Sequence, residues 1–363
     1  MKSKLSIKFL AVILIVSALF VFTACGDKND TPPTHDNALT SKVVLFIGDG
    51  MGPDHVYNTE LYTGETMYFS SFATKTTVDT NSLSGVTDSA ASATAMATGQ
   101  RVKNDTVAMG TDGKAIMSIT ELAKNDKYGT GVVTSDDITG ATPAGFSGHA
   151  KKRNNSAEIL LSQKENQLDL LLGSGNHPTA YKNLFEEKGW TWATKFSEIS
   201  LEQKRFVATF TDVSHSDPTD EKPSLTQLAT FAIDYMEAHY PTGYFLMIEG
   251  AKIDKASHSG DVSEMIANTI DFNSAIKSVD QKLSATGSGY SIIVTADHET
   301  GGLQRAENKD AISDDLYTTT GHTDTKVGLY FKSTLEVAPE LLNKEVILNT
   351  EIFLLCKQLL GIA

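Results

Sequence analysis

The stretch TDSAASATAMATG, residues 87–99, is built almost entirely from small side chains, with one acid and a run of hydroxyls. Asp and Ser are favoured N-caps, so one interpretation is that Asp88 and Ser89 simply begin a helix. Small residues let such a helix pack closely against its neighbours. The stretch therefore predicts a helix over 90–98. The rest of the chain decides whether Asp88 and Ser89 also have a functional role.

Outside this stretch, short apolar runs alternate with helical patterns. Runs rich in β-branched residues and bounded by Gly, Asp or Ser predict six strands, at 42–48, 128–135, 205–210, 243–250, 290–297 and 326–331. Helical periodicity predicts further helices at 118–125, 224–240, 263–285 and 349–361. Ser263 resembles the N-cap of the third of these. Continuous apolar strands between helices favour an α/β fold with a doubly wound, mostly parallel central sheet and helices on both faces. Because no repeat or linker follows residue 41, we expect a single domain.

The bulk composition narrows the classes of partner. The chain has 363 residues, 40% hydrophobic, and a formal net charge of −14. Such acidity argues against nucleic acid, whose phosphates need basic patches. It also conflicts with an anionic substrate, unless bound cations reverse the local sign. Of the two cysteines, Cys356 lies in a helical pattern and is predicted to be a buried core thiol.

The N-terminus predicts export. A basic start, MKSKLSIK, precedes an apolar run of 14 residues (9–22), which is short for a membrane span. The following TAC resembles a bacterial lipobox, so we expect a signal peptide at 1–24, a lipidated Cys25 and a flexible tether over 25–41. The folded domain then covers 42–363. The alternative is an ordinary secretory signal cleaved near Ala24. The expected location is outside the cytoplasm, as a periplasmic or outer-membrane-anchored lipoprotein of a Gram-negative bacterium.

Four predicted strands end in polar clusters: FIGDGMG (46–52), VVTSDDITGATP (132–143), MIEGAKIDKASH (247–258) and VTADHETGG (294–302). Ligands bind at the carboxyl ends of strands in open α/β sheets, so these side chains should converge. The carboxylates and imidazoles suit Zn²⁺, whereas an all-oxygen pair suits Mg²⁺. The candidates are Asp49, Asp254, His258, Asp297, His298 and His322 for zinc, and Thr142 and Glu249 for magnesium. His55, His177 and His239 are predicted to be surface or packing residues.

Taken together, VVLFIGDGMG, TDSAASATAMATG, TGATPAGFSGH, IEGAKIDKASH, TADHETGG and GHT resemble the alkaline phosphatase family, from about Val43 to the C-terminus. The resemblance implies that Ser89 is the nucleophile that takes the phosphoryl group. It implies one zinc on Asp254, His258 and His322, a second on Asp49, Asp297 and His298, and a magnesium site on Asp49, Thr142 and Glu249. Arg153 matches the arginine that grips phosphate, with Lys151 or Lys152 as alternatives.

Two positions stand apart from this pattern. The family usually has an Asp or His two residues before the Thr of ATP, and here that position is Gly140. The third metal site is then weaker, uses water, or recruits Asp136 or Asp137. Lys255 resembles a lysine of some bacterial members, near the phosphate or its water shell; the alternative is a solvated surface lysine.

The resemblance thus implies a metal-dependent phosphomonoesterase with two Zn²⁺ and one Mg²⁺, acting on small-molecule phosphate monoesters and binding no nucleic acid. A homodimer remains open, since family members often form one. The alternatives are a phosphate-binding surface lipoprotein without turnover and a phosphodiesterase of the same superfamily.

Overall fold

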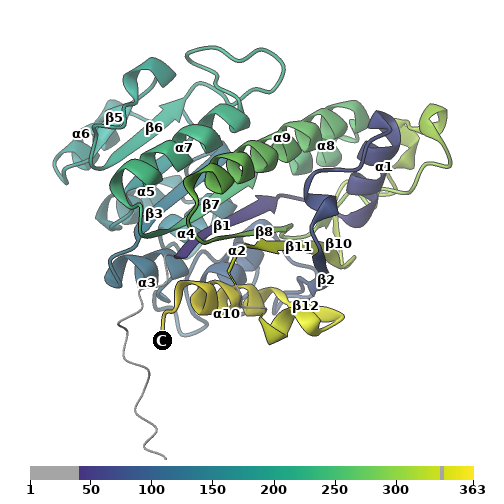
Figure 1. Cartoon of the computed structure of the whole chain (residues 1–363), viewed down its shortest axis with the longest axis horizontal. Coiled ribbons are helices and arrows are strands. Elements are labelled where there is room, and N and C mark those ends of the chain that lie inside the picture. The colour runs from purple at the N-terminus through teal and green to yellow at the C-terminus, as the bar shows by residue number, and fades with distance from the viewer. Residues whose placement is uncertain (1–40, 336–338) are drawn as a thin grey trace, which may run out of the picture. The chain divides into compact units, whose positions relative to one another are not determined.

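The computed structural model describes residues 41–335 and 339–363 (Figure 1). The predicted signal peptide, Cys25 and nearly all of the tether lie outside the described residues, so those predictions are not tested. Within the described part of the chain, no helix is long and apolar enough to cross a membrane. The described residues form one compact unit.

The core of the fold is a ten-stranded sheet with the order β12-β2-β11-β8-β1-β7-β3-β4-β6-β5. Its strands are β1 (Ser41–Gly48), β2 (Thr74–Asp79), β3 (Gly129–Asp137), β4 (Leu170–Ser174), β5 (Thr191–Ala193), β6 (Phe206–Phe210), β7 (Gly243–Gly250), β8 (Tyr290–Thr295), β11 (Val327–Ser333) and β12 (Val346–Leu348). All neighbouring pairs are parallel except the two made by β11, which is antiparallel to β8 and β2. The predicted doubly wound, mostly parallel sheet is confirmed.

Helices cover both faces of the sheet (Figure 1). One layer contains α1 (Pro53–Thr63), α7 (Leu225–His239), α8 (Lys252–Ser259) and α9 (Val262–Thr286). The other contains α2 (Ser89–Thr98), α3 (Ile119–Asn125), α4 (Ala141–Ser147) and α10 (Asn349–Leu360), while α5 (Ser156–Glu165) contacts α4, and α6 (Thr179–Glu186) lies near β5. Since every residue of β1 and β7 is buried between these layers, their sequences are continuous apolar runs without alternation.

Most sequence predictions of elements hold, with instructive exceptions. All six predicted strands and all five predicted helices are present. The long helix begins at Val262 with Asp261 as its N-cap, so the prediction that Ser263 caps it was wrong. Strands β2, β4, β5 and β12 were missed because they are short or lie in polar segments. Cys356 is a buried free thiol, as predicted.

Helix α2 explains the small residues of the opening stretch. All ten of its residues are buried, between α4 and α10. A Cβ built on Gly145 of α4 would lie 2.9 Å from the Cβ of Ala93, so the two helices approach as closely as glycine and alanine allow. This packing holds α2 between α4 and α10, and the Ser92 hydroxyl near its start donates to the Asp297 carbonyl beyond β8 at 2.7 Å.

Candidate active site

The candidate site lies where three central strands end side by side. Strand β1 pairs with β7 on one side and β8 on the other, with Ile47 opposite both Glu249 and Thr295. Asp49 follows β1 directly, and Asp297 lies two residues beyond β8. Gly50 has a φ of +71°, and a Cβ there would lie 2.9 Å from the backbone of Asp254, so only glycine lets this turn approach α8. The predicted convergence of strand ends is therefore present.

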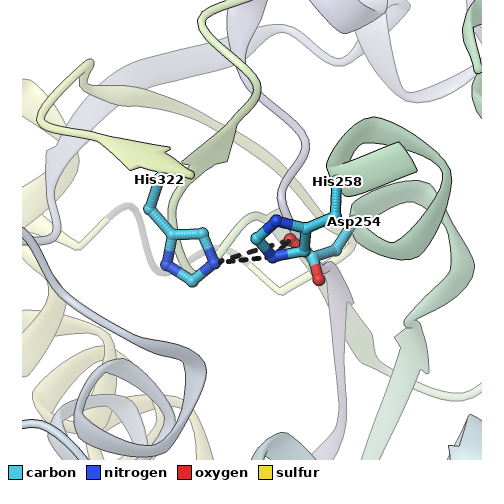
Figure 2. A group of neighbouring side chains, drawn as sticks. All are labelled: Asp254, His258 and His322. Atoms are coloured by element: carbon cyan, nitrogen blue, oxygen red, sulfur yellow. Dashed lines mark hydrogen bonds and ion pairs between the residues drawn. The ribbon is translucent and has the colours of Figure 1, made fainter. Parts of the chain in front are cut away.

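The first group of candidate metal ligands is Asp254, His258 and His322 (Figure 2). Asp254 and His258 lie one turn apart in α8, with 3.3 Å between Oδ1 and Nε2. The two imidazole Nε2 atoms are 3.1 Å apart, and His322 Nε2 is 3.7 Å from Asp254 Oδ1. His322 comes from a distant segment, which the small sheet of β9 (Glu299–Thr300) and β10 (His322–Thr323) pairs with Thr300. Three ligand atoms thus face one small space.

A second group surrounds the Nε2 atom of His298. That atom lies 3.1 Å from Asp297 Oδ2 and 3.5 Å from Asp49 Oδ1. All three residues are buried. Asp49 and His298 also lie within ligand distance of Asp254, which therefore belongs to both groups. The two groups adjoin each other, as two cations that act on one substrate require.

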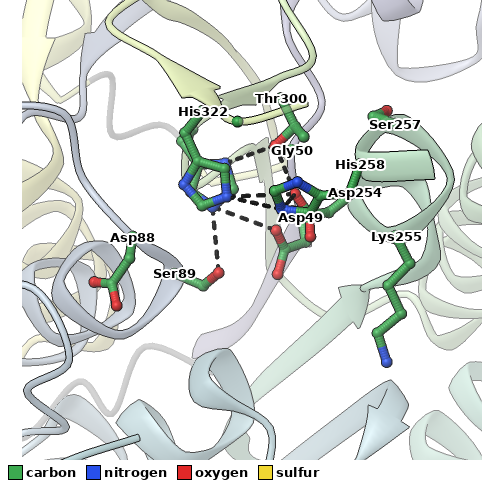
Figure 3. Close-up of polar contacts among 12 residues, drawn as sticks. Asp49, Gly50, Asp88, Ser89, Asp254, Lys255, Ser257, His258, Thr300 and His322 are labelled. Atoms are coloured by element: carbon green, nitrogen blue, oxygen red, sulfur yellow. Dashed lines mark hydrogen bonds and ion pairs between the residues drawn. The ribbon is translucent and has the colours of Figure 1, made fainter. Parts of the chain in front are cut away.

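Ser89, labelled in Figure 3, is the first residue of α2. Its Oγ lies 3.2 Å from Nε2 of His298. Asp88 is the N-cap, and its side chain accepts a hydrogen bond from the N–H of Ala91 at 2.9 Å. The helix-cap interpretation of the opening stretch is therefore confirmed for Asp88, while Ser89 lies beside the candidate ligand His298. The helix N-terminus adds positive potential beside the Ser89 hydroxyl.

Arg153 joins this site through Asp88. Its Nη1 lies 3.2 Å from Asp88 Oδ2, and its backbone N–H donates to the carbonyl of Asp105 at 2.8 Å. Burial acts against the charged guanidinium, but the carboxylates of Asp88 and Asp49 raise the pKa of Arg153. The neighbouring Lys151 and Lys152 are exposed and form no ion pair among the described residues. Of the three cations, Arg153 is thus the one the structure brings to Ser89.

Thr142 contacts Asp49, and the Glu249 carboxylate lies near enough to raise the pKa of Asp49. The Thr142 hydroxyl donates a long hydrogen bond to Asp49 Oδ2 at 3.4 Å, and Thr134 donates to Glu249. Both predicted magnesium ligands are buried to about 99%. Burial, with the nearby Asp136 charge, raises the pKa of Glu249 to about 8. Burial and the Asp297 carboxylate also raise the pKa of Asp49 well above its usual range.

These residues fit metal ions. Asp49 Oδ1 and Asp297 Oδ2 are buried carboxylate oxygens that receive no hydrogen bond. A buried, unsatisfied carboxylate oxygen is costly unless a cation contacts it. Although burial opposes it, the Asp297 carboxylate raises the pKa of His298. The mixture of carboxylate and imidazole donors suits zinc, and the oxygen-only group around Glu249 suits magnesium.

The positions around Gly140 differ from the rest. Gly140 is the N-cap of α4, and the Asp136 carboxylate fills the space beside it. That carboxylate contacts Lys255, the residue after Asp254. Lys255 is exposed and its ammonium is ion-paired with Asp136, so both predictions for this lysine stay open.

Sequence reasoning missed the residues that orient the candidate ligands. The Thr300 hydroxyl donates to Asp254 Oδ1 at 2.5 Å and lies 3.2 Å from His298 Nδ1. The carbonyl of Thr87 lies 2.9 Å from His322 Nδ1. Such contacts fix the ring orientation of a ligating histidine. The only available signal for Thr300 was its position two residues after His298. His55 and His177, by contrast, are packing residues, as expected.

The family model described as alkaline phosphatase matches residues 40–172 and 205–344. The chain belongs to the alkaline phosphatase family. Its reaction class is accordingly the hydrolysis of phosphate monoesters, and metal cofactors are expected of it.

Individual relatives agree. Alkaline phosphatase 4 of Bacillus subtilis is 29% identical over 338 residues, covering 85% of this chain and 72% of that protein. Alkaline phosphatase 3 of the same organism is 30% identical, covering 72% and 61%. Among solved structures, alkaline phosphatase from the Antarctic bacterium TAB5 is 29% identical, with a TM-score of 0.77, covering 89% of this chain and 98% of that one. A mutant of that protein has been described with Mg bound in its M3 site.

Proposed function

We propose that this family member hydrolyses phosphate monoesters with Ser89 as the nucleophile, through a phosphoserine intermediate. The observation that carries the proposal is the 3.2 Å separation between Ser89 Oγ and Nε2 of His298, beside two buried carboxylates that each have one oxygen without a hydrogen bond. A serine hydroxyl is a weak nucleophile and needs activation. Asp49, Asp297 and His298 would hold a zinc ion at the position where it lowers the pKa of that hydroxyl.

The second zinc would be held by Asp254, His258 and His322. Bound there, it supplies a Lewis acid for the leaving oxygen and an activated water for the hydrolysis of phosphoserine. Asp49, Thr142 and Glu249 would hold one magnesium ion. These ions would also offset the carboxylates around the site, which removes the conflict between an acidic chain and an anionic substrate.

Arg153 would bind two non-bridging oxygens of the phosphoryl group, since a guanidinium offers paired donors in one plane. Asp88 holds that guanidinium next to Ser89 and at the same time caps α2. The N–H groups at the start of α2 are available to the same phosphoryl group. Attack by Ser89 would form the phosphoserine bond as the alcohol leaves, and water would then release inorganic phosphate.

We also propose export with a lipid anchor at Cys25, supported by the basic start, the apolar run and the TAC sequence. Cys25→Ser removes the atom that would carry the lipid, so its cleaved product should lose membrane association in fractionation of a Gram-negative host. Equal membrane association of the cleaved wild-type and Cys25→Ser proteins would contradict the anchor.

The test of the catalytic proposal is hydrolysis of p-nitrophenyl phosphate by metal-stripped protein that is given back Zn²⁺, with and without Mg²⁺. Wild type should regain turnover, and Ser89→Ala should lose at least about 10³-fold in kcat. Ser84→Ala, on the exposed turn preceding the helix, is the matched control and should keep wild-type turnover. Phosphate binding without turnover in any metal would overturn the proposal, and preference for bis(p-nitrophenyl) phosphate would favour a phosphodiesterase.

A further inference from the structure

A cavity of about 370 Å³ lies outside the candidate active site, toward the edge of the sheet opposite β12 (Figure 1). It opens where β4 and β6 end: Gly175 directly follows β4, and Thr209 and Thr211 flank the last residue of β6. These strands are the third and fourth from β1 in the order β1-β7-β3-β4-β6. At about 4.8 Å per strand, the cavity lies roughly 14–19 Å from the end of β1. It is therefore separate from the candidate metal ligands.

The chain connections that leave β4 and β6 diverge at this cavity. After β4 the chain enters α6, which contacts α5, and returns as β5 at the outer edge of the sheet. After β6 it enters α7, which packs against α9 on the other face. Such a divergence is a topological switch point, and open α/β sheets bind ligands in the crevice that it leaves beyond the strand ends. The topology thus marks the cavity as a place for a ligand.

Most of the cavity wall comes from a segment that the family model does not describe. The model matches residues 40–172 and 205–344, so residues 173–204 lie between the matched ranges. Gly175, His177, Lys182 and Trp192 line the cavity and belong to this segment. A ligand bound here would therefore be particular to this chain and would not follow from the reaction that the family shares.

The floor of the cavity is firmly packed and carries donors without partners. His177 Nε2 lies 3.2 Å from Asp137 Oδ1, and the His177 ring packs edge-on against Trp192 with 6.2 Å between centroids. Trp192 is 8% exposed and Thr209 is 4% exposed. Among the described residues, neither the Trp192 indole N–H nor the Thr209 hydroxyl has a hydrogen-bond partner. Since buried donors are normally paired, these two are available to a ligand.

The charges at the rim of the cavity favour an anion. The Lys182 ammonium is 3.9 Å from Glu186 in an exposed i,i+4 pair, an arrangement that contributes little stability. Helix α6 begins beside it after Pro178, which offers no side-chain cap, and its first turn has no acidic residue. The free N–H groups and the dipole of a helix start attract negative charge. Within the described part of the chain, no Asp or Glu lines the cavity.

We propose that this cavity binds a small organic anion, at a site separate from Ser89. The Lys182 ammonium and the start of α6 would hold a carboxylate or phosphate head. The Thr209 hydroxyl and the Trp192 indole N–H would donate to oxygens of the body. Ligand pockets begin at about 300 Å³, so the cavity has room for an organic body as well as the charged head. The proposal does not depend on the proposed function.

Tryptophan fluorescence tests this directly, because the chain has two tryptophans, Trp192 in β5 and Trp190 just before it. Metal-loaded protein is titrated at constant ionic strength with D-glucuronate, with inorganic phosphate and with D-glucose as the neutral comparator. At least one anion should give a saturable change at a concentration at least about tenfold lower than glucose. The anion that does so identifies the head group. Trp190→Phe should keep the response, because Trp192 is the reporter.

Variants locate the response in the cavity. Lys182→Met should weaken anion binding at least about tenfold, and Thr209→Val at least about threefold. Lys188→Met is the matched control, since Lys188 belongs to the same segment, pairs with Glu165 at 2.8 Å and does not line the cavity. It should stay within about twofold of wild type. Arg153→Ala, at the proposed phosphate site beside Ser89, should leave the fluorescence response to both anions unchanged.

The absence of a saturable response to either anion would overturn the proposal, and so would a response to D-glucose at the same concentration as to the anions. Equal losses in Lys182→Met and Lys188→Met would overturn it as well, because the response would then not come from the cavity. Loss of the response in Arg153→Ala would place the anion at the catalytic site instead. If wild type lacks turnover while these fluorescence results hold, only the proposed function fails.

Discussion

Buried aspartates at the amino ends and at the carboxyl ends of the central strands have different surroundings. Asp169, at the amino end of β4, is 4% exposed, and Asp49, at the carboxyl end of β1, is 6% exposed. Asp169 contacts the ammonium of Lys124 at 2.6 and 2.7 Å, and it also accepts from the Tyr240 hydroxyl at 2.6 Å. Asp49 has an oxygen without any hydrogen-bond donor.

The difference shows how a structural carboxylate can be distinguished from one prepared for a ligand. Burial is the same, so burial alone decides nothing. At the amino end of β4 the chain supplies donors to the Asp169 carboxylate, and the ion pair of Asp169 with Lys124 stabilises the fold. At the carboxyl edge the chain gathers Asp49, Asp297 and Glu249 with too few donors, and the deficit is what bound cations would correct.

The largest expected effect comes from exchanging the two aspartates for asparagine. Asp49→Asn should lower kcat/KM by at least about 100-fold and reduce metal content, because one oxygen ligand is lost from two cation sites. Its metal-free form should be no less stable than wild type, since a repulsive charge is removed. Asp169→Asn should keep kcat/KM near wild type and lose about 3 kcal/mol of unfolding free energy, because Lys124 is left unpaired.

Enzyme kinetics, elemental analysis and urea unfolding of the metal-free proteins measure these effects. The comparison fails if Asp49→Asn destabilises the metal-free protein as much as Asp169→Asn does. It fails equally if Asp169→Asn depletes the bound metal.

Metal removal should have the next largest effect. Cations that bind the folded state stabilise it by about 2.7 kcal/mol when their concentration is 100 times the dissociation constant. Chelation of wild type should therefore lower its melting temperature, and Zn²⁺ should restore it, as followed by calorimetry. Asp169→Asn should show the same metal-dependent shift from a lower baseline, whereas Asp297→Asn should show a much smaller one. Equal metal-dependent shifts of the melting temperature in both variants would contradict the assignment of the metal sites to the carboxyl ends of the strands.

A smaller effect concerns His55, which is fully buried with Nε2 at 3.0 Å from the Ser257 hydroxyl. Burial lowers the pKa of His55 to about 3. An unfolded histidine binds its proton near pH 6.5, so His55 contributes stability that is complete above that pH and is lost as pH falls toward 3. The loss is at most about 1.4 kcal/mol per pH unit.

Urea unfolding of metal-free protein between pH 7 and pH 5 measures this. His55→Gln should show a shallower decrease than wild type, and His239→Gln, whose ring contacts the Leu201 carbonyl at the surface, should follow wild type. Identical slopes for wild type and His55→Gln would disprove the account.

Local signals made much of this molecule predictable. β1 and β7 are continuous apolar runs because helices cover both faces of the sheet, and that pattern is visible in the sequence. The residues at their ends were identifiable as candidates by type and position. The exposed or short strands β2, β5 and β12 carry no such pattern, since neighbouring strands and not their own composition keep them in the sheet. Asp261 as the cap of α9 was also decided by backbone geometry that composition does not specify.

The sequence by itself determined the α/β architecture, the family and the set of candidate residues, because each depends on periodicity or on short motifs. Only the tertiary structure decided how these residues combine. It brought His322 to His258 through a two-stranded sheet, chose Arg153 over two neighbouring lysines by pairing it with Asp88, and placed Asp136 in the space left by Gly140. The physical reason is range. Hydrophobic periodicity acts between near neighbours in the chain, whereas the contacts of the candidate site join residues that are 64 apart (His258 and His322) to 209 apart (Ser89 and His298).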